Sequence, residues 1–142
     1  MHYTIKSQLL AVIFLLSVSL FSTVSADVGQ LTNEQVKTLM DENVPIIDIR
    51  RPDEWKSTGV IKGSHLLTFF DAKGDYDLDD WLKKLDKIVK KDQKFVVVCR
   101  SGNRSGQVTQ FLDTQLHYTK VNHLKNGIKN WIGAGDQVVS AK

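Results

Sequence analysis

The sequence predicts an α/β fold in a single domain. The run of β-forming apolar residues at 95–98 is continuous rather than alternating, as in a strand buried on both faces of a parallel sheet, and a second strand is predicted at 44–49. Other stretches carry apolar residues at helical spacing. The run 95–98 passes through a short polar loop directly into such a stretch, which is the strand, loop and helix order of a parallel sheet.

The amino end of the chain predicts a secretory signal peptide over residues 1–26. Lys6 precedes an almost entirely apolar stretch at residues 9–21, and the small residues at 24–26 match a signal peptidase site. The apolar stretch is too short and wrongly flanked for a transmembrane helix, with an uncleaved anchor as the alternative. We therefore expect a mature domain at residues 27–142 that is exported, periplasmic in a Gram-negative source, and not stably inserted in a membrane after cleavage.

The first half of the mature chain contains a predicted helix and two predicted strands. The helix spans residues 32–40, where Thr32 and Gln35 have the spacing of a capping box. The strand at 44–49 follows, with Pro45 near its start, where a missing N–H group is tolerated. A shorter strand is predicted within residues 65–70.

The acid-rich run from Asp75 to Asp80 comes before the next predicted helix, whose apolar stripe ends at Val89. Its carboxylates alternate as in a calcium-binding loop, but Asp80 stands where the sharp turn of such a loop needs glycine. Acids that cap and charge the start of a helix explain the run better. We therefore predict no metal site.

A helix from Ser105 to residue 116, a strand at 120–124 and a short helix at 126–131 complete the pattern. His117 and His123 follow no metal-ligand spacing, and we interpret both as surface or packing residues.

Basic and acidic side chains are nearly balanced, with 19 of the first kind and 16 of the second, for a net charge of +3. The lysines between residues 83 and 94 are interleaved with acids and leucines, as on a solvated helix face. Stacking aromatic residues do not accompany them in any pattern typical of nucleic-acid binding. We expect no nucleic-acid partner.

Cys99 is the only cysteine, so the chain cannot form an internal disulfide. It ends a predicted strand, and the carboxyl ends of strands are where open α/β sheets bind ligands. The N–H groups of the next turn, the start of the next helix, Arg100 and Arg104 would all favour a thiolate. We therefore predict an accessible nucleophile in an anion-binding loop rather than a core cysteine.

The segment Cys99-Arg100-Ser101-Gly102-Asn103-Arg104-Ser105 resembles the active-site loop of rhodanese-type sulfurtransferases. An upstream stretch with Asp48 and Arg50 resembles a second signature of that family. A downstream stretch resembles a third, with Asn126-Gly127 where the family usually has two glycines. Asparagine also tolerates a positive φ, so we expect that turn to survive.

This resemblance implies the rhodanese fold, a small, mostly parallel five-stranded sheet with helices on both faces. Within the family, the chain is most similar to the exported single-domain rhodaneses typified by phage shock protein E. The implied activity is that of a thiosulfate sulfurtransferase. Cys99 would take a sulfane sulfur from thiosulfate or a similar small anionic donor as a persulfide and pass it to a thiophilic acceptor. This covalent intermediate requires no cofactor.

The resemblance also assigns the site, with Cys99 as the catalytic residue. The substrate-binding residues that it implies are Arg100, Ser101, Gly102, Asn103, Arg104 and Ser105. The two arginines would attract the donor, unless one of them points to solvent, and the others would contribute mainly backbone groups. Asp48 and Arg50 share a strand face and are expected at the site wall, as a buried ion pair more than as chemical groups.

Three alternatives remain. The first is a rhodanese-like persulfide carrier or docking module, with a thiol protein as acceptor. Phosphatases and arsenate reductases of the same fold form the second, but their loop is Cys-x5-Arg, one residue longer than the spacing of Cys99 and Arg104. A dithiol oxidoreductase, the third, would need a resolving cysteine. The chain is expected to be a monomer.

Overall fold

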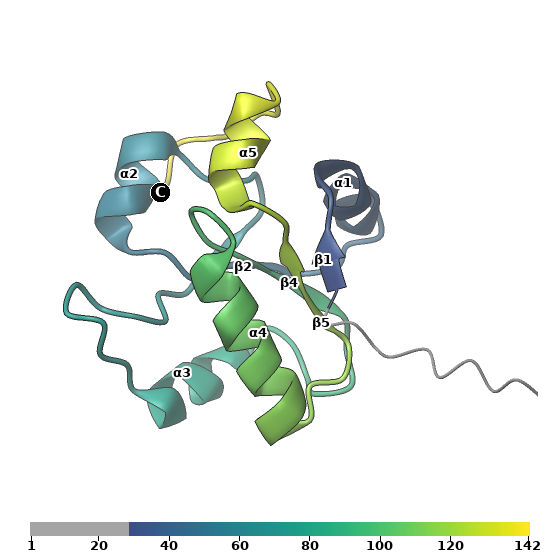
Figure 1. Ribbon diagram of the computed structural model, residues 1–142, viewed down its shortest axis with the longest axis vertical. Coiled ribbons are helices and arrows are strands. Elements are labelled where there is room, and N and C mark those ends of the chain that lie inside the picture. Colours follow the sequence, from purple (N-terminus) through teal and green to yellow (C-terminus); the bar gives the residue numbers. More distant parts are fainter. Residues whose placement is uncertain (1–28) are drawn as a thin grey trace, which may run out of the picture.

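The computed structural model describes residues 29–142, so the predicted signal peptide lies outside the described residues. Five strands and five helices alternate along this part of the chain (Figure 1). In chain order they are β1 (Gly29–Leu31), α1 (Asn33–Asp41), β2 (Ile46–Asp48), α2 (Pro52–Thr58), β3 (His65–Leu66), α3 (Leu78–Leu85), β4 (Phe95–Val98), α4 (Asn103–Leu116), β5 (Val121–Leu124) and α5 (Gly127–Gly133).

The five strands form one sheet in the order β1-β5-β4-β2-β3, and every strand pair is parallel. β4 lies at the centre, with Val97 paired to Ile47 of β2 and to His123 of β5. All four residues of β4 are buried, as the continuous apolar run predicts for a central parallel strand. The predicted α/β sheet of five strands is confirmed, and it is entirely parallel.

Helices cover both faces of the sheet. On one face α3 and α4 pack over a cluster that includes Trp81, Leu112 and Val97. On the other face Val36 of α1 and Trp131 of α5 pack with Val96 and its neighbours. Because adjacent residues of β4 point to opposite faces, this one strand contributes to both halves of the core.

The sequence pattern located neither β1 nor α2. β1 has only three residues, and it is a strand because its backbone pairs with β5, as in the register of Leu31 with Leu124. α2 has no buried residue and therefore no apolar stripe, although Pro52 stands at its start, where proline is favoured. Neither element carries the hydrophobic period by which helices and strands are predicted.

The predicted starts of two helices are confirmed in detail. Thr32 accepts from the N–H of Gln35, whose side chain accepts from the N–H of Thr32, which completes the capping box. Asp77 caps α3 by accepting from the N–H of Asp80. α3 ends at Leu85, four residues before the predicted end of its stripe.

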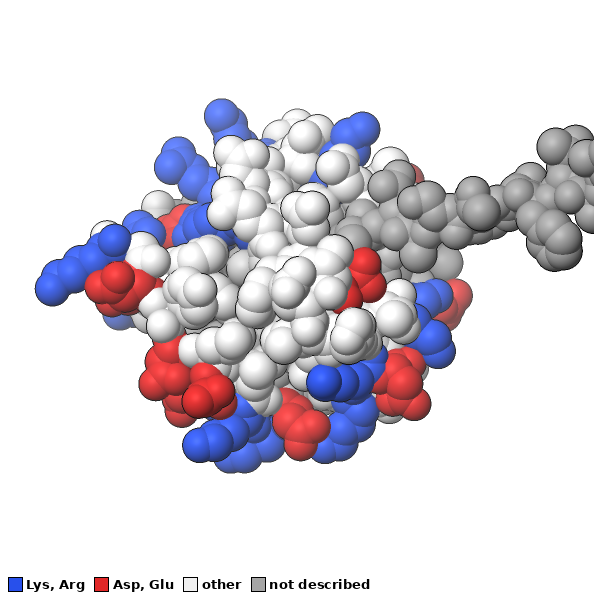
Figure 2. Space-filling model, turned by 60° about the horizontal axis from the view of Figure 1, so that its bottom comes forward, with Lys and Arg blue, Asp and Glu red and all other residues white. Residues whose placement is uncertain are grey.

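Among residues 29–142 there is no cluster of acidic, histidine or cysteine side chains that could hold a metal ion. Likewise, no helix within this part of the chain is both long and apolar enough to cross a bilayer. On the face shown in Figure 2, basic and acidic side chains lie next to one another along the lower rim of an uncharged centre.

Candidate active site

Cys99 lies directly after β4, at the carboxyl edge of the sheet. Its Sγ accepts a hydrogen bond from the backbone N–H of Gly102 over 3.1 Å. The hydroxyl of Ser105 lies 3.2 Å from the same sulfur. The N–H of Gly102 and the hydroxyl of Ser105 therefore converge on Sγ, and when both donate to it they stabilise a negative charge there.

The loop reaches this geometry through Gly102, which has a φ of 94° and precedes the first residue of α4. Because the backbone turns there, α4 begins at Asn103 rather than at Ser105, where the sequence predicted its start. The earlier start brings the first turn of α4, with its positive dipole end, to the sulfur. Ser105 thereby becomes a first-turn residue facing inward, with its side chain buried.

The prediction of an accessible sulfur is wrong for this structure. Cys99 is 1% exposed and packs in the core cluster on the α4 face of the sheet, together with Phe69 and Val108. The sulfur is nevertheless not sealed in hydrocarbon, since Gly102 and Ser105 supply polar contacts.

The two arginines of the loop occupy different surroundings. Arg100 is exposed. Arg104 is partly buried and donates to both carboxylate oxygens of Glu54 in α2, at 2.9 and 2.6 Å. The hydrogen bond to Glu54 is the main cause that raises the pKa of Arg104, and the charge of Cys99 adds to it. Arg104 is therefore held in place by Glu54, whereas Arg100 extends from the loop into solvent.

Glu54 is a site residue that the sequence reasoning did not single out. Burial alone would raise the pKa of Glu54, but hydrogen bonds from Arg104 and from the N–H of Arg51, with their charges, hold that pKa at about 2. The carboxylate thus stays charged and fixes the guanidinium. Glu54 follows Arg50 in the same stretch of sequence, but the sequence does not indicate its pairing with Arg104, fifty residues away.

Asp48 and Arg50 form a fully buried ion pair at the end of β2, with 2.7 Å between Arg50 Nη2 and Asp48 Oδ2. Arg50 also donates to the hydroxyl of Thr58 over 2.7 Å and to the carbonyl of Gly59 over 3.0 Å. The pair therefore ties α2 to the edge of the sheet. Because α2 carries Glu54, the pair also helps to hold the helix from which Glu54 contacts Arg104.

The remaining loop residues, Ser101 and Asn103, expose their side chains to solvent. The carbonyls of Cys99 and Arg100 accept from the N–H groups of Ile128 and Lys129, which anchors the loop on the start of α5.

The turn before α5 approaches the loop so closely that a side chain has no room there. Asn126 and Gly127 have φ values of 61° and 64°, so the asparagine adopts the conformation expected of a glycine pair. A Cβ on Gly127 would lie 2.4 Å from the carbonyl carbon of Arg100. The downstream motif thus contributes a surface against which the cysteine loop packs.

His123 is the second site residue that sequence reasoning missed, since it was interpreted as a surface or packing residue. It lies on β5 and is 5% exposed, with Nδ1 3.2 Å from the hydroxyl of Ser105. Burial lowers the pKa of His123, which favours the neutral imidazole. Alternation along the strand could have indicated this position. Side chains two residues apart in a strand point to the same face, so His123 shares a face with Val121, which packs under α4.

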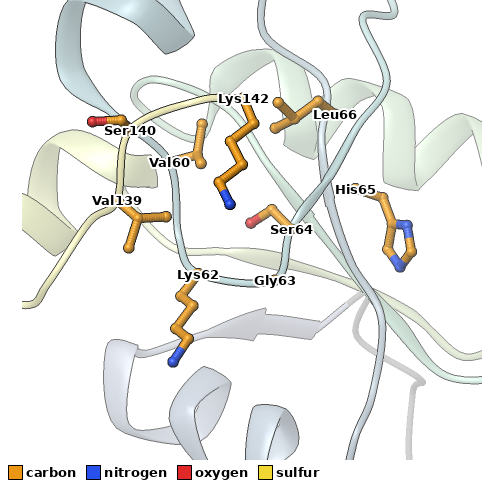
Figure 3. A pocket seen from close by; sticks show the side chains of 9 residues that line it. All are labelled: Val60, Lys62, Gly63, Ser64, His65, Leu66, Val139, Ser140 and Lys142. Carbon is orange, nitrogen blue, oxygen red and sulfur yellow. The ribbon is translucent and has the colours of Figure 1, made fainter.

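A separate hollow of about 750 Å³ lies between the segment from Val60 to Leu66 and the carboxyl-terminal residues (Figure 3). It is at the amino end of β3, whereas Cys99 follows the carboxyl end of β4. In Figure 3 the side chains of Lys62 and His65 point away from the space between the other lining residues. This hollow contains none of the residues of the cysteine loop.

With this geometry in view, the chain can be compared with known families. Residues 32–134 match the rhodanese-like domain. The chain belongs to the rhodanese family. A comparison with curated protein sequences finds no match.

Solved structures agree with this assignment. A rhodanese-related protein from Thermoplasma volcanium is 26% identical with a TM-score of 0.60, and the match covers 80% of this chain and 99% of that one. A thiosulfate sulfurtransferase from Pseudomonas aeruginosa is also 26% identical, with a TM-score of 0.63, and the match covers 80% of this chain but 20% of the other.

A third similar structure is a protein of unknown function from Rhodopseudomonas palustris, described as a possible tyrosine phosphatase. It is 26% identical with a TM-score of 0.56, and the match covers 78% of this chain and 84% of that one. The rhodanese fold therefore supports a sulfurtransferase-type assignment. The choice between sulfur transfer and phosphate hydrolysis depends on the loop from Cys99 to Ser105.

Proposed function

We propose that this rhodanese is a sulfurtransferase that moves a sulfane sulfur from thiosulfate, or a similar small anion, to a thiophilic acceptor through a persulfide on Cys99. The observation that carries the proposal is that the Gly102 N–H and the Ser105 hydroxyl converge on Sγ of Cys99, the single cysteine of the chain. Such a site supports a thiolate and the anionic persulfide that follows it.

The first displacement forms one S–S bond and breaks another. The thiolate of Cys99 attacks the outer sulfur of thiosulfate, the S–S bond of the donor breaks, and sulfite leaves with the bonding electron pair. The guanidinium of Arg104, fixed by Glu54, attracts the dianionic donor and stabilises the sulfite that departs. Arg100 assists from its exposed position by raising the local concentration of the anion.

The second displacement transfers the terminal sulfur of the persulfide. A thiophilic acceptor such as cyanide attacks that sulfur, and the electron pair of the broken S–S bond returns to Cys99 as a thiolate. The protein ends the cycle in the state in which it began, without a cofactor or metal. Both steps use only the anion-stabilising groups of residues 100–105.

The test is production of thiocyanate from thiosulfate and cyanide by residues 27–142, with the Cys99→Ser variant beside it. We expect activity in the wild type and its complete loss in the variant. Mass spectrometry after thiosulfate alone should show the mass of one added sulfur atom on the wild type and none on the variant. Wild-type protein that gains no sulfur and forms no thiocyanate would contradict the proposal.

The loop length favours sulfur over phosphate chemistry. Cys99 and Arg104 are separated by four residues, one fewer than in the Cys-x5-Arg loops of phosphatases and arsenate reductases. The same preparation should therefore fail to hydrolyse an aryl phosphate. Hydrolysis that Cys99→Ser abolishes would move the assignment to a phosphatase, and sulfur uptake without transfer to small acceptors would indicate a persulfide carrier.

A further inference from the structure

The hydroxyl of Ser105 lies between the sulfur of Cys99 and the imidazole of His123. Its Oγ is 3.2 Å from Sγ on one side and 3.2 Å from His123 Nδ1 on the other. The carbonyl of Gly102, also 3.2 Å from Oγ, is a further acceptor. The three side chains come from the end of β4, from α4 and from β5, so the sheet and the helix together fix their order.

A serine hydroxyl has one proton to donate and two lone pairs that accept. When Cys99 is a thiol, its S–H can donate to Ser105, and the hydroxyl can donate onward to His123 Nδ1. When Cys99 is a thiolate, the hydroxyl must donate to the sulfur, and the imidazole must then donate to the hydroxyl. The direction of both hydrogen bonds therefore depends on the charge of the sulfur.

His123 is suited to the first of these states. It is 5% exposed, and because burial lowers its pKa the ring is neutral and has a free lone pair. The other edge of the ring faces Gly106, where a Cβ would lie 3.7 Å from Nε2, so the helix backbone crowds that nitrogen only lightly. One nitrogen thus contacts Ser105, and the other adjoins a position without a side chain.

The charged groups around this chain of hydrogen bonds lie on α4, directly before Ser105, and on neighbouring elements. Arg104 and its partner Glu54 lie on α4 and α2, and the buried pair of Asp48 and Arg50 follows β2. The neighbouring strands β1 and β4 contain no charged residue. Besides the thiol of Cys99 itself, the imidazole of His123 is therefore the titratable group that contacts Ser105 directly.

We propose that His123 is a positioning residue for Cys99, which acts through the hydroxyl of Ser105 to take the proton of the thiol and then hold that hydroxyl directed at the thiolate. The thiol proton moves to Ser105 as the serine proton moves to Nδ1. The imidazolium then loses the proton on Nε2, so that one proton in total leaves for solvent. The neutral ring that remains carries its hydrogen on Nδ1 and donates it to Ser105.

This inference rests on the proposed function, because it concerns the thiolate that would attack the sulfur donor. Its test needs no sulfur transfer. Cys99 is the only cysteine, so the ultraviolet absorbance of thiolate, with the spectrum of Cys99→Ser subtracted, reports the ionisation of this one sulfur. Failure of the transfer assay and failure of this titration are therefore separate results.

The informative comparison is between His123→Leu and His123→Asn. Leucine fills the buried space but cannot donate to Ser105, whereas the amide of asparagine can donate near the place of Nδ1. We expect the thiolate titration of His123→Leu to move to higher pH by about one unit, which is roughly a tenfold lower thiolate fraction. His123→Asn should stay close to the wild type, although asparagine fills the core less well.

Three further variants complete the test, each checked for folding by its thermal melt. Ser105→Ala should shift the titration upward, and Ser105→Ala with His123→Leu should shift it no further, because His123 acts only through Ser105. His117→Asn, a matched change at an exposed histidine, should leave the titration unchanged. A wild-type titration in folded His123→Leu, or additive shifts in the double variant, would overturn the proposal and leave His123 as a packing residue.

Discussion

Arg104 and Glu54 are fifty residues apart in the chain, and the guanidinium of one donates to both carboxylate oxygens of the other. This pair joins the start of α4, beside the sulfur of Cys99, to α2. A bidentate pair restricts the guanidinium to one plane, so the arginine is oriented before a ligand arrives. The loop from Cys99 to Ser105 is thereby held in place by Glu54, a residue of α2 that lies outside the loop itself.

Removal of the charge of Glu54 should destabilise the protein in a pH-dependent way. Because the folded pKa of Glu54 is about 2, against an ordinary value of 4.5, its stabilisation is fully present above about pH 4.5 and is lost as the pH falls toward 2. Glu54→Gln should therefore cost about 1–3 kcal/mol near neutral pH and progressively less in acid. Urea denaturation at several pH values measures this difference.

The control for Glu54 is Asp53→Asn on the same helix. Asp53 is largely exposed and pairs only with Arg51 at the surface, so its loss should change the free energy of unfolding by less than about 0.5 kcal/mol. A Glu54→Gln penalty that stays constant between pH 7 and pH 3 would contradict the assigned role of the carboxylate.

The buried pair of Asp48 and Arg50 should tolerate joint replacement better than the loss of one partner. Asp48→Asn leaves the guanidinium of Arg50 in the core without its counter-ion, and we expect a cost of about 3–5 kcal/mol. The double variant Asp48→Leu with Arg50→Met removes both charges and should be more stable than Asp48→Asn. Denaturation midpoints of the wild type, Asp48→Asn and the double variant rank their stabilities. A double variant less stable than Asp48→Asn would contradict the expected cost of an unpaired buried charge.

Gly127 should be irreplaceable, while Gly133 at the other end of the same helix should not be. A Cβ on Gly127 would lie 2.4 Å from backbone atoms of Arg100, at a φ of 64°. Gly127→Ala should therefore cost about 2–4 kcal/mol and displace the cysteine loop, which would lower sulfur transfer as well. Thermal melts and the thiocyanate assay report the two effects.

Gly133→Ala is the matched control, because a Cβ there would meet no atom within 4 Å. It should change stability by less than about 1 kcal/mol and leave the transfer rate as it is. Asn126→Gly should also be tolerated, since the backbone at Asn126 already has a φ of 61°. Equal losses in Gly127→Ala and Gly133→Ala would contradict this account, because only Gly127 contacts the cysteine loop.

The amino-terminal segment should direct export of the domain. We predict a cleaved signal peptide from its charged start, its apolar stretch and the small residues at 24–26. In a bacterial host with two membranes, we expect the protein in the periplasmic fraction with Asp27 at its amino terminus, as read by mass spectrometry. Full-length protein that stays in the membrane fraction would indicate an uncleaved anchor instead.

Much of the fold was predictable because its central parts are local. The run at Phe95–Val98 is continuous and apolar, and the capping box of Thr32 lies within four residues, so each pattern is complete in a short window of sequence. β1 and α2 were not predictable in this way. β1 is held by backbone pairing to β5, and α2 is held by the bonds of Arg50 to Thr58 and Gly59.

The sequence by itself determined the loop from Cys99 to Ser105, its single cysteine and its place after a buried strand, because those features are contiguous in the chain. Tertiary structure alone decided that Glu54 orients Arg104, that Arg100 faces solvent, and that His123 meets Ser105 beneath the sulfur. These relations arise where β2, β4 and β5 end at one edge of the sheet. A hydrogen bond between side chains on different strands and helices leaves no periodic trace in the sequence.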